Sequence, residues 1–172
     1  QHFCSSLTGT TPNRLYLWTG TVRAEQKADS PAKLFNSEVD YGNEQSWTAF
    51  PERLEDAGVS WKIYQNEMSV ESGFTGEEDA WLGNFTDNPI EWFRQYHVRF
   101  AAAHRRYLAE REQALPGEIE ALEALSPSPD REQKLAAARE ELAEVRRERE
   151  TYTDAAWAAL TPWQRSLHDR AF

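Results

Sequence analysis

The 172-residue chain has a single cysteine, Cys4, so an intrachain disulfide is excluded. It contains no run near the ~18 consecutive apolar residues that a membrane-spanning helix needs. Positive charge is also scarce, with 19 Lys and Arg against 29 Asp and Glu and a net charge of −10. Because nucleic acids and anionic membranes select basic surfaces, this balance argues against nucleic acid as a partner and against simple electrostatic docking on anionic lipid. The chain begins at Gln1 without an initiator Met, and we expect it to be an internal segment of a longer protein.

A hydroxyl-rich segment with one glycine, residues 8–11, leads into Pro12 and an apolar stretch. Proline is favoured at the start of a helix, because its missing N–H would lack an acceptor there. We therefore expect Thr10 or Thr11 at or just before a helix start. Such a start offers unpaired N–H groups and the positive end of the helix dipole to an anion, and a hydroxyl held there can attack a phosphate. From composition alone, loop and capping hydroxyls are the simpler interpretation.

Residues 48–64 have the pattern of half an α/β unit. Thr48 is a plausible N-cap for a helix that ends near Ala57, with Gly58 just beyond it. The short β-branched and aromatic run at 59–64 then predicts a strand. The acidic, glycine-containing stretch at 66–86 predicts a loop.

The second half of the sequence predicts helices. An Asn-Pro-Ile-Glu start at 88–91 favours a helix from Pro89 to about Leu115, which Pro116-Gly117 would interrupt. After a turn at 126–129, residues 130–150 are rich in Ala, Glu and Arg with a narrow apolar stripe, typical of an antiparallel helical hairpin. A Thr-Pro-Trp-Gln capping box at residues 161–164 predicts one more helix start. The composition changes near residue 105, which predicts a domain at 1–105 and a helical hairpin with the following helix at 106–172.

Three blocks of this sequence resemble, in the same order, segments of the bacterial phosphocholine-specific phospholipases C. The first block, at residues 4–21, contains Thr-Thr-Pro-Asn-Arg-Leu-Tyr at 10–16; the others are residues 47–65 and 84–93. These enzymes are related to a group of acid phosphatases within the alkaline-phosphatase-like superfamily. The resemblance covers roughly residues 2–100 and is specific, because the three blocks occur in order.

The resemblance implies the α/β fold class: a fragment of a three-layer alkaline-phosphatase-like fold, predominantly helical here, with an inserted Glu/Arg-rich hairpin. It implies that the parent hydrolyses the phosphodiester of phosphatidylcholine-type lipids. Thr10 matches the hydroxyl that attacks phosphorus and binds a divalent metal. Thr11 remains the alternative, because Thr8 and Gly9 stand where the family has Gly-Pro. Asn13 is assigned to substrate binding, with a structural role as its alternative.

The resemblance also implies a cofactor, a divalent metal of unspecified identity. The four histidines have no metal-motif spacing, and the acidic run Glu77-Glu78-Asp79 lacks the pattern of a calcium loop. We therefore expect most metal ligands to lie outside this chain and the isolated segment to be inactive. The expected partners are a phospholipid or phosphocholine ester substrate and the rest of the parent chain, packed on this segment. The resemblance implies a secreted or periplasmic protein.

Two other functions remain open. An acid phosphatase of the same superfamily would share the nucleophile segment, and a non-catalytic helical interaction module would use the hairpin at 118–150. Aromatic side chains can form a cage for choline, but at helical and strand spacing they usually form core. We assign the following to the core: Trp47, Trp61, Trp81 and Trp92.

Overall fold

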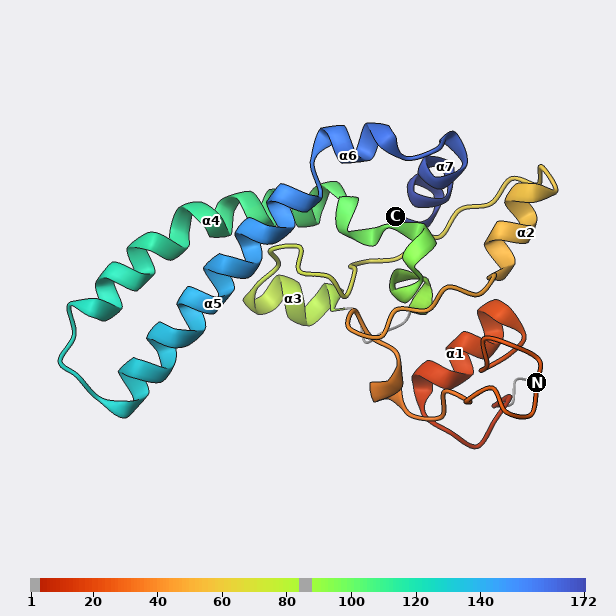
Figure 1. The fold of residues 1–172 in the computed structure, drawn as a ribbon, viewed down its shortest axis with the longest axis horizontal. Coiled ribbons are helices and arrows are strands. Elements are labelled where there is room, and N and C mark those ends of the chain that lie inside the picture. Colours follow the sequence, from red (N-terminus) through yellow and green to blue (C-terminus); the bar gives the residue numbers. More distant parts are fainter. Residues whose placement is uncertain (1–3, 84–87) are drawn as a thin grey trace. The chain divides into compact units, whose positions relative to one another are not determined.

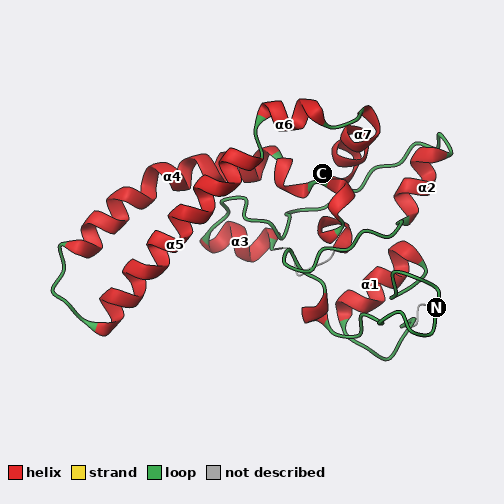
Figure 2. Cartoon of the chain, viewed as in Figure 1, coloured by secondary structure: helices red, strands yellow, loops and turns green. Residues whose placement is uncertain are grey.

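The computed structural model describes residues 4–83 and 88–172, which fold as helices joined by long loops (Figures 1 and 2). The α-helices are α1 (Thr10–Thr19), α2 (Phe50–Asp56), α3 (Gly76–Leu82), α4 (Ala102–Glu123), α5 (Pro129–Thr151), α6 (Asp154–Ala159) and α7 (Pro162–Ala171). Short 3-10 helices are η1 (Asn36–Glu38), η2 (Pro89–Trp92), η3 (Arg94–Tyr96) and η4 (Val98–Phe100). None of the helices in these residues is long and apolar enough to cross a bilayer.

The strand predicted at residues 59–64 is wrong, because this segment is an extended coil and no strand occurs in the described chain. Its Ile63 N–H donates at 2.9 Å to the carbonyl of Arg170 near the end of α7. A helix end thus takes the place of a strand partner, and backbone groups form a ladder only when a second strand lies alongside. The predominantly helical character is confirmed, while the three-layer fold remains a prediction for the longer protein.

The predicted loop at residues 66–86 contains a helix, α3. Three acidic residues occupy its first turn, where negative charge is stabilised by the helix dipole: Glu77, Glu78 and Asp79. The predicted exposure of these three side chains is confirmed, and the predicted loop conformation is wrong. Residues 84–87, which include the start of the third resembling block, lie outside the described residues.

The helix predicted over residues 89–115 is present only in its second half. Asn88 caps as predicted, its Oδ1 accepting from the Ile90 N–H at 3.3 Å, but three short 3-10 helices follow. His97 then adopts a left-handed conformation, with φ of 52°, and ends η3. A residue in that conformation cannot continue a right-handed helix, so α4 begins only at Ala102.

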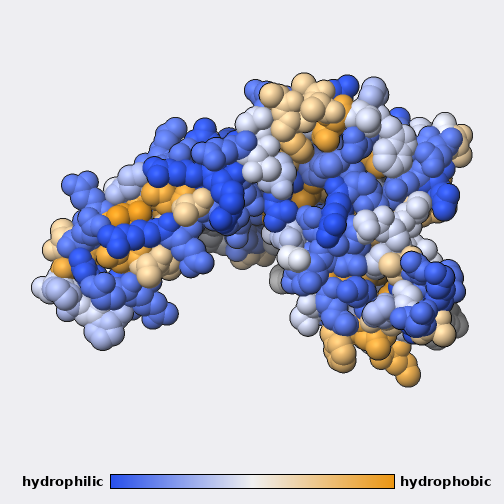
Figure 3. Space-filling model, in the orientation of Figure 1, coloured by the Kyte–Doolittle hydropathy of each residue, from blue (hydrophilic) through white to orange (hydrophobic). Residues whose placement is uncertain are grey.

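The predicted helical hairpin is confirmed, and it consists of α4 and α5 (Figure 1). The expected interruption at Pro116-Gly117 is wrong, since α4 continues through both residues. Leu115, just before the proline, is fully buried in the hairpin, and packing of this kind outweighs the local cost of a proline. The core of the hairpin consists of Leu108, Leu115, Ala138 and Val145. Figure 3 shows apolar side chains along this hairpin between flanking charged ones.

The contacts divide the chain into two compact units. We call Gln1–Val70, Phe74–Val98 and Thr161–Phe172 the first unit, and Glu71–Gly73 with Arg99–Leu160 the second unit. The composition-based division at residue 105 remains a prediction about domains. The contacts place a boundary between the two units at Val98 and Arg99, and they assign α7 to the first unit.

The core of the first unit gathers residues from distant parts of the sequence. Its fully buried side chains include Leu15 of α1, Ile90 of η2 and Leu167 of α7. The capping box predicted at the start of α7 is confirmed, with the Thr161 hydroxyl accepting from the Gln164 N–H. α7 thereby starts at the position that brings Leu167 into this core.

Candidate functional site

The start of α1 lies where the sequence placed it. The helix begins at Thr10 with Gly9 as N-cap, so the predicted start at Thr10 or Thr11 is confirmed. Pro12 is the third helical residue rather than the first, but the N–H of that position also lacks a helical acceptor. A Cβ on Gly9 would clash with Oδ1 of Asn36, so any other residue here would displace the Asn36 side chain. The same Asn36 oxygen accepts from the Thr11 N–H at 3.0 Å and fixes the helix start.

The two threonines at this start are in different surroundings. Thr10 is exposed, and within residues 4–83 and 88–172 its N–H and hydroxyl make no hydrogen bond. Thr11 is only 1% exposed. A substrate can therefore approach the Thr10 hydroxyl directly, whereas it could reach Thr11 only after the structure opened.

Asn13 lies one turn further along α1 and folds back on the preceding loop. Its Nδ2 donates to the carbonyls of Gly9 at 3.0 Å and Ser6 at 3.1 Å, and its Oδ1 accepts from the Ser6 N–H at 3.1 Å. These are the contacts of a residue that holds residues 6–9 against the helix. Direct binding of a substrate by Asn13 remains a prediction.

The first unit holds two buried or half-buried histidines, His97 and His168. Burial lowers the pKa of both side chains, and for His97 the neighbouring His168 lowers it further. His168 faces the carbonyl of Tyr96 with Nδ1 at 3.1 Å, so that nitrogen carries the proton of the neutral ring and donates. Each histidine joins α7 to the segment at 96–97, because His97 Nε2 lies 3.2 Å from Nε2 of Gln164 and His168 of α7 bonds to Tyr96. His2 lies outside the described residues.

The donor set for a metal is sparse in this chain. Within the described ranges, no three His, Cys, Asp or Glu side chains come together as a metal-binding group. The exposed hydroxyl of Thr10 fits one oxygen-ligand position of a divalent cation and supplies no more than that. The prediction that most ligands lie outside this chain stays a prediction.

The aromatic side chains assigned to the core are there, with one exception. Trp92 is 5% exposed, and Trp47 and Trp61 pack partly buried against the same cluster. Trp81 is 80% exposed on α3, so its assignment to the core is wrong. A helix inside the supposed loop presents this side chain to solvent rather than to the interior.

Two side chains that shape this region were missed by the sequence analysis. Asn36 makes contacts 25 residues away in the sequence, and no local pattern marks it. Glu91 is 1% exposed and accepts hydrogen bonds from the Tyr41 hydroxyl at 2.7 Å and the Ser69 N–H at 2.6 Å. A charge inside the apolar run at 90–93 was a usable signal, because a buried carboxylate requires donors.

The helix start with an exposed threonine lies within the part of the chain that matches a known family. The model of the Phosphoesterase family matches residues 1–124, more than half of the sequence, and the chain belongs to this family. The match covers the first unit without its last segment, Thr161–Phe172, and in the second unit it covers η4 and all of α4.

The chain is similar to three bacterial proteins named phospholipase C. It is 39% identical over 98 residues to a non-hemolytic phospholipase C of Burkholderia pseudomallei, with 55% of this chain covered. It is 37% identical over 99 residues to the protein of that name in Pseudomonas aeruginosa, with 56% covered. It is 46% identical over 67 residues to phospholipase C B of Mycobacterium tuberculosis, with 39% covered. The matches span only 12–13% of these relatives' lengths, and no solved structure matches the chain.

Proposed function

We propose that the chain is a segment of a phospholipase C that hydrolyses the phosphodiester of phosphatidylcholine-type lipids with Thr10 as nucleophile. The observation that carries this proposal is the exposed Thr10 hydroxyl at the first position of α1, next to a buried Thr11. Family membership and the phospholipase C names of the relatives support the reaction class. The phosphocholine head group is the part of the proposal that rests only on the resemblance of the three blocks, because the first block is shared with the acid phosphatases.

In the proposed reaction the Thr10 oxygen bonds to phosphorus and its proton is released, while the bond from phosphorus to the glycerol oxygen breaks. The diacylglycerol leaves with a proton, and water then cleaves the phospho-threonine to release phosphocholine and restore the hydroxyl. The free N–H of Thr10 and the positive end of α1 face the charge that develops on the phosphoryl oxygens. Asn13 and Asn36 hold this helix start in place.

A divalent metal bound at the Thr10 hydroxyl would supply charge neutralisation and a lower hydroxyl pKa. Thr10 is the residue of this chain that would hold it, with the other ligands contributed by the parent. The isolated 172-residue chain is then inactive, and the parent acts in a secreted or periplasmic setting. Assaying the isolated chain with and without added divalent cations checks the first statement, and turnover would contradict it.

The nucleophile is tested by Thr10→Ala in the full-length parent, assayed on a chromogenic phosphocholine ester. We expect turnover to fall by at least about a thousandfold, as for removal of a covalent nucleophile. Thr75→Ala is the matched control, because Thr75 is another exposed threonine beside a helix start. Undiminished turnover of Thr10→Ala would contradict the assignment of Thr10, and a thousandfold loss in Thr11→Val beside it would assign the nucleophile to Thr11 instead. Higher turnover of phosphomonoesters than of diesters in the unmodified parent would favour the acid phosphatase alternative.

We further propose that the rest of the parent packs on the first unit. Apolar side chains around α1 are strongly exposed in this chain: Leu7 at 103%, Leu17 at 75% and Phe35 at 67%. Burial of such a group stabilises an interface by roughly 25 cal/mol per Å² of apolar area. In a Cys4→Ser background, Leu17→Cys should react quickly with a thiol reagent in the isolated chain and slowly in the parent. Equal rates in both would contradict this packing.

A further inference from the structure

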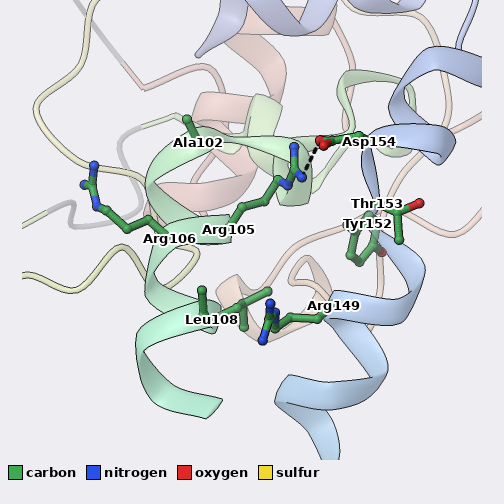
Figure 4. Close-up of a pocket in the computed structure, with 9 residues that line it drawn as sticks. Ala102, Arg105, Arg106, Leu108, Arg149, Tyr152, Thr153 and Asp154 are labelled. Atoms are coloured by element: carbon green, nitrogen blue, oxygen red, sulfur yellow. Dashed lines mark hydrogen bonds and ion pairs between the residues drawn. The ribbon is translucent and has the colours of Figure 1, made fainter. Parts of the chain in front are cut away.

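The second unit contains a cavity of about 500 Å³ that the proposed phosphodiesterase reaction does not use. It opens between the first turns of α4, the last turn of α5 and the start of α6 (Figure 4). Apolar and aromatic side chains form part of its wall: Ala102, Leu108 and Tyr152. The cavity thus combines an apolar surface with charged groups.

Positive charge is concentrated in this cavity, although the chain carries a net charge of −10. Arg105 and Arg106 of α4 and Arg149 of α5 line it, against a single acidic residue, Asp154. Figure 4 shows the side chains of Arg105 and Arg149 reaching into the space between α4 and the end of α5, while Arg106 extends away from it. Two guanidinium groups from different helices therefore face one space, an arrangement that suits an oxyanion.

Asp154 already shows how an anion can bind there. Its Oδ1 accepts from Nη2 of Arg105 at 2.6 Å, yet the Asp154 side chain is 91% exposed. An ion pair this exposed contributes little to stability and exchanges readily with solvent ions. The Asp154 carboxylate therefore occupies the Arg105 guanidinium as a replaceable internal anion. On the other wall, Arg149 pairs with Glu112 of α4 and keeps further donors of its planar group.

We propose that this cavity, between Arg105 and Arg149, binds a phosphate group, either free or as a lipid head group. A phosphate oxyanion presents several acceptor oxygens to the guanidinium groups of two helices at once, whereas the Asp154 carboxylate engages one of them. The binding site stands independently of Thr10, since it lies in the other unit and uses no residue of the α1 start.

The test is a titration of the 172-residue chain with inorganic phosphate, followed by amide NMR shifts at residues 102–109 and 149–154. Arg105→Gln and Arg149→Gln should each weaken binding about tenfold, the loss of one charge-assisted hydrogen bond. Asp154→Asn should tighten binding several-fold, because the competing carboxylate is gone. Arg139→Gln, an exposed ion-paired arginine elsewhere on α5, is the matched control and should leave binding unchanged.

The sign of the Asp154→Asn effect separates a binding site from a structural ion pair. Weaker or unchanged phosphate binding in this variant overturns the proposal, and so does an equal loss in Arg139→Gln. Acetate that binds as tightly as phosphate also overturns it, since the site would then be a carboxylate site. Co-sedimentation with phosphatidic acid vesicles, competed by inorganic phosphate and absent in Arg105→Gln, identifies a lipid head group. Phosphate binding without co-sedimentation identifies free phosphate as the ligand.

Discussion

The two units of this chain are stabilised in different ways. In the second unit two long helices pack along an apolar seam, and charged pairs such as Arg111 with Glu141 lie at its edges. In the first unit the helices are short, and side chains bond to groups far away in the sequence, such as Glu91 to Tyr41 and Ser166 to Glu55. Sequence periodicity therefore determines the hairpin, whereas individual long-range hydrogen bonds determine the unit that carries Thr10.

The largest effect on stability is expected from the seam of the hairpin. Leu115→Ala empties a fully buried position of α4, and a change of this kind costs about 2–5 kcal/mol of the free energy of unfolding. Chemical denaturation followed by circular dichroism measures it. Leu125→Ala, at a side chain that is 58% exposed, is the control and should change stability by less than about 0.5 kcal/mol. Similar losses in both variants would mean that the seam does not stabilise the hairpin.

In the first unit the buried side chain whose removal we expect to matter is polar, namely Glu91. Glu91→Ala removes the acceptor of two half-buried donors, the Tyr41 hydroxyl and the Ser69 N–H, and the loss should cost about 1–3 kcal/mol of the free energy of unfolding. Hydrogen exchange at the Ser69 amide should accelerate, while amides of α5 stay protected. Glu77→Ala, which removes an exposed acid, is the control. Unchanged exchange at Ser69 in Glu91→Ala would show that long-range hydrogen bonds are dispensable there.

The sequence predicted well what depends on local pattern. The turn at 126–129, the charged helix of α5 and the capping box at Thr161 followed from neighbouring residues, and all three are present. The helix start at Thr10 also followed from its neighbours, because hydroxyls, glycine and proline act within one turn. The prediction of a phosphoesterase needed three ordered blocks, and the family match confirms it.

What the sequence did not reveal depends on distant partners. The strand at 59–64 failed because its backbone pairs with α7, more than a hundred residues away. The continuous helix through Pro116 was missed because packing of Leu115 outweighs proline's local preference. Asn36 fixes the start of α1 from 25 residues away, and the residues next to Asn36 in the sequence do not indicate this contact. The local pattern therefore predicted the helix start at Thr10, but it did not predict the long-range contact that supports this start.

The pH response should distinguish the units. Burial lowers the pKa of His97 and His168 below the ordinary 6.5, so the unfolded chain takes up protons before the folded one does. The stability of the first unit is thus complete above pH 6.5 and falls as the pH drops below that value. In the second unit, burial raises the pKa of Glu148, but the His104 hydrogen bond and the Arg99 charge outweigh burial and hold it below 4.5. Its contribution is lost only below pH 4.5.

His97→Asn sharpens this contrast. Asparagine tolerates the left-handed conformation at this position and does not titrate, so the decline in stability below pH 6.5 should become shallower. Denaturation midpoints of both proteins between pH 8 and pH 5 measure the difference, and their offset at pH 8 gives the loss of packing alone. Parallel curves over the whole range would mean that His97 does not contribute to the acid sensitivity.

The smallest effect is expected at the edges of the hairpin. Arg111 donates to Glu118 at 2.6 Å and to Glu141 at 2.7 Å, and the first of these bonds lowers the pKa of Glu118. The carboxylates are nevertheless 48% and 39% exposed, so water and salt screen the attraction. Arg111→Gln should therefore cost no more than about 1 kcal/mol, and the cost should shrink at high salt. Urea denaturation at low and high ionic strength measures both.

Lys134→Gln is the matched variant for a single exposed pair, since Lys134 and Asp130 are one turn apart on α5. Its cost should be about 0.3–0.5 kcal/mol, below that of Arg111→Gln, which breaks two pairs. A loss above about 2 kcal/mol in Arg111→Gln that persists at high salt would reverse the comparison drawn between the units. The hairpin would then depend on specific polar contacts, as the first unit does, and its apolar seam would set only the register of α4 against α5.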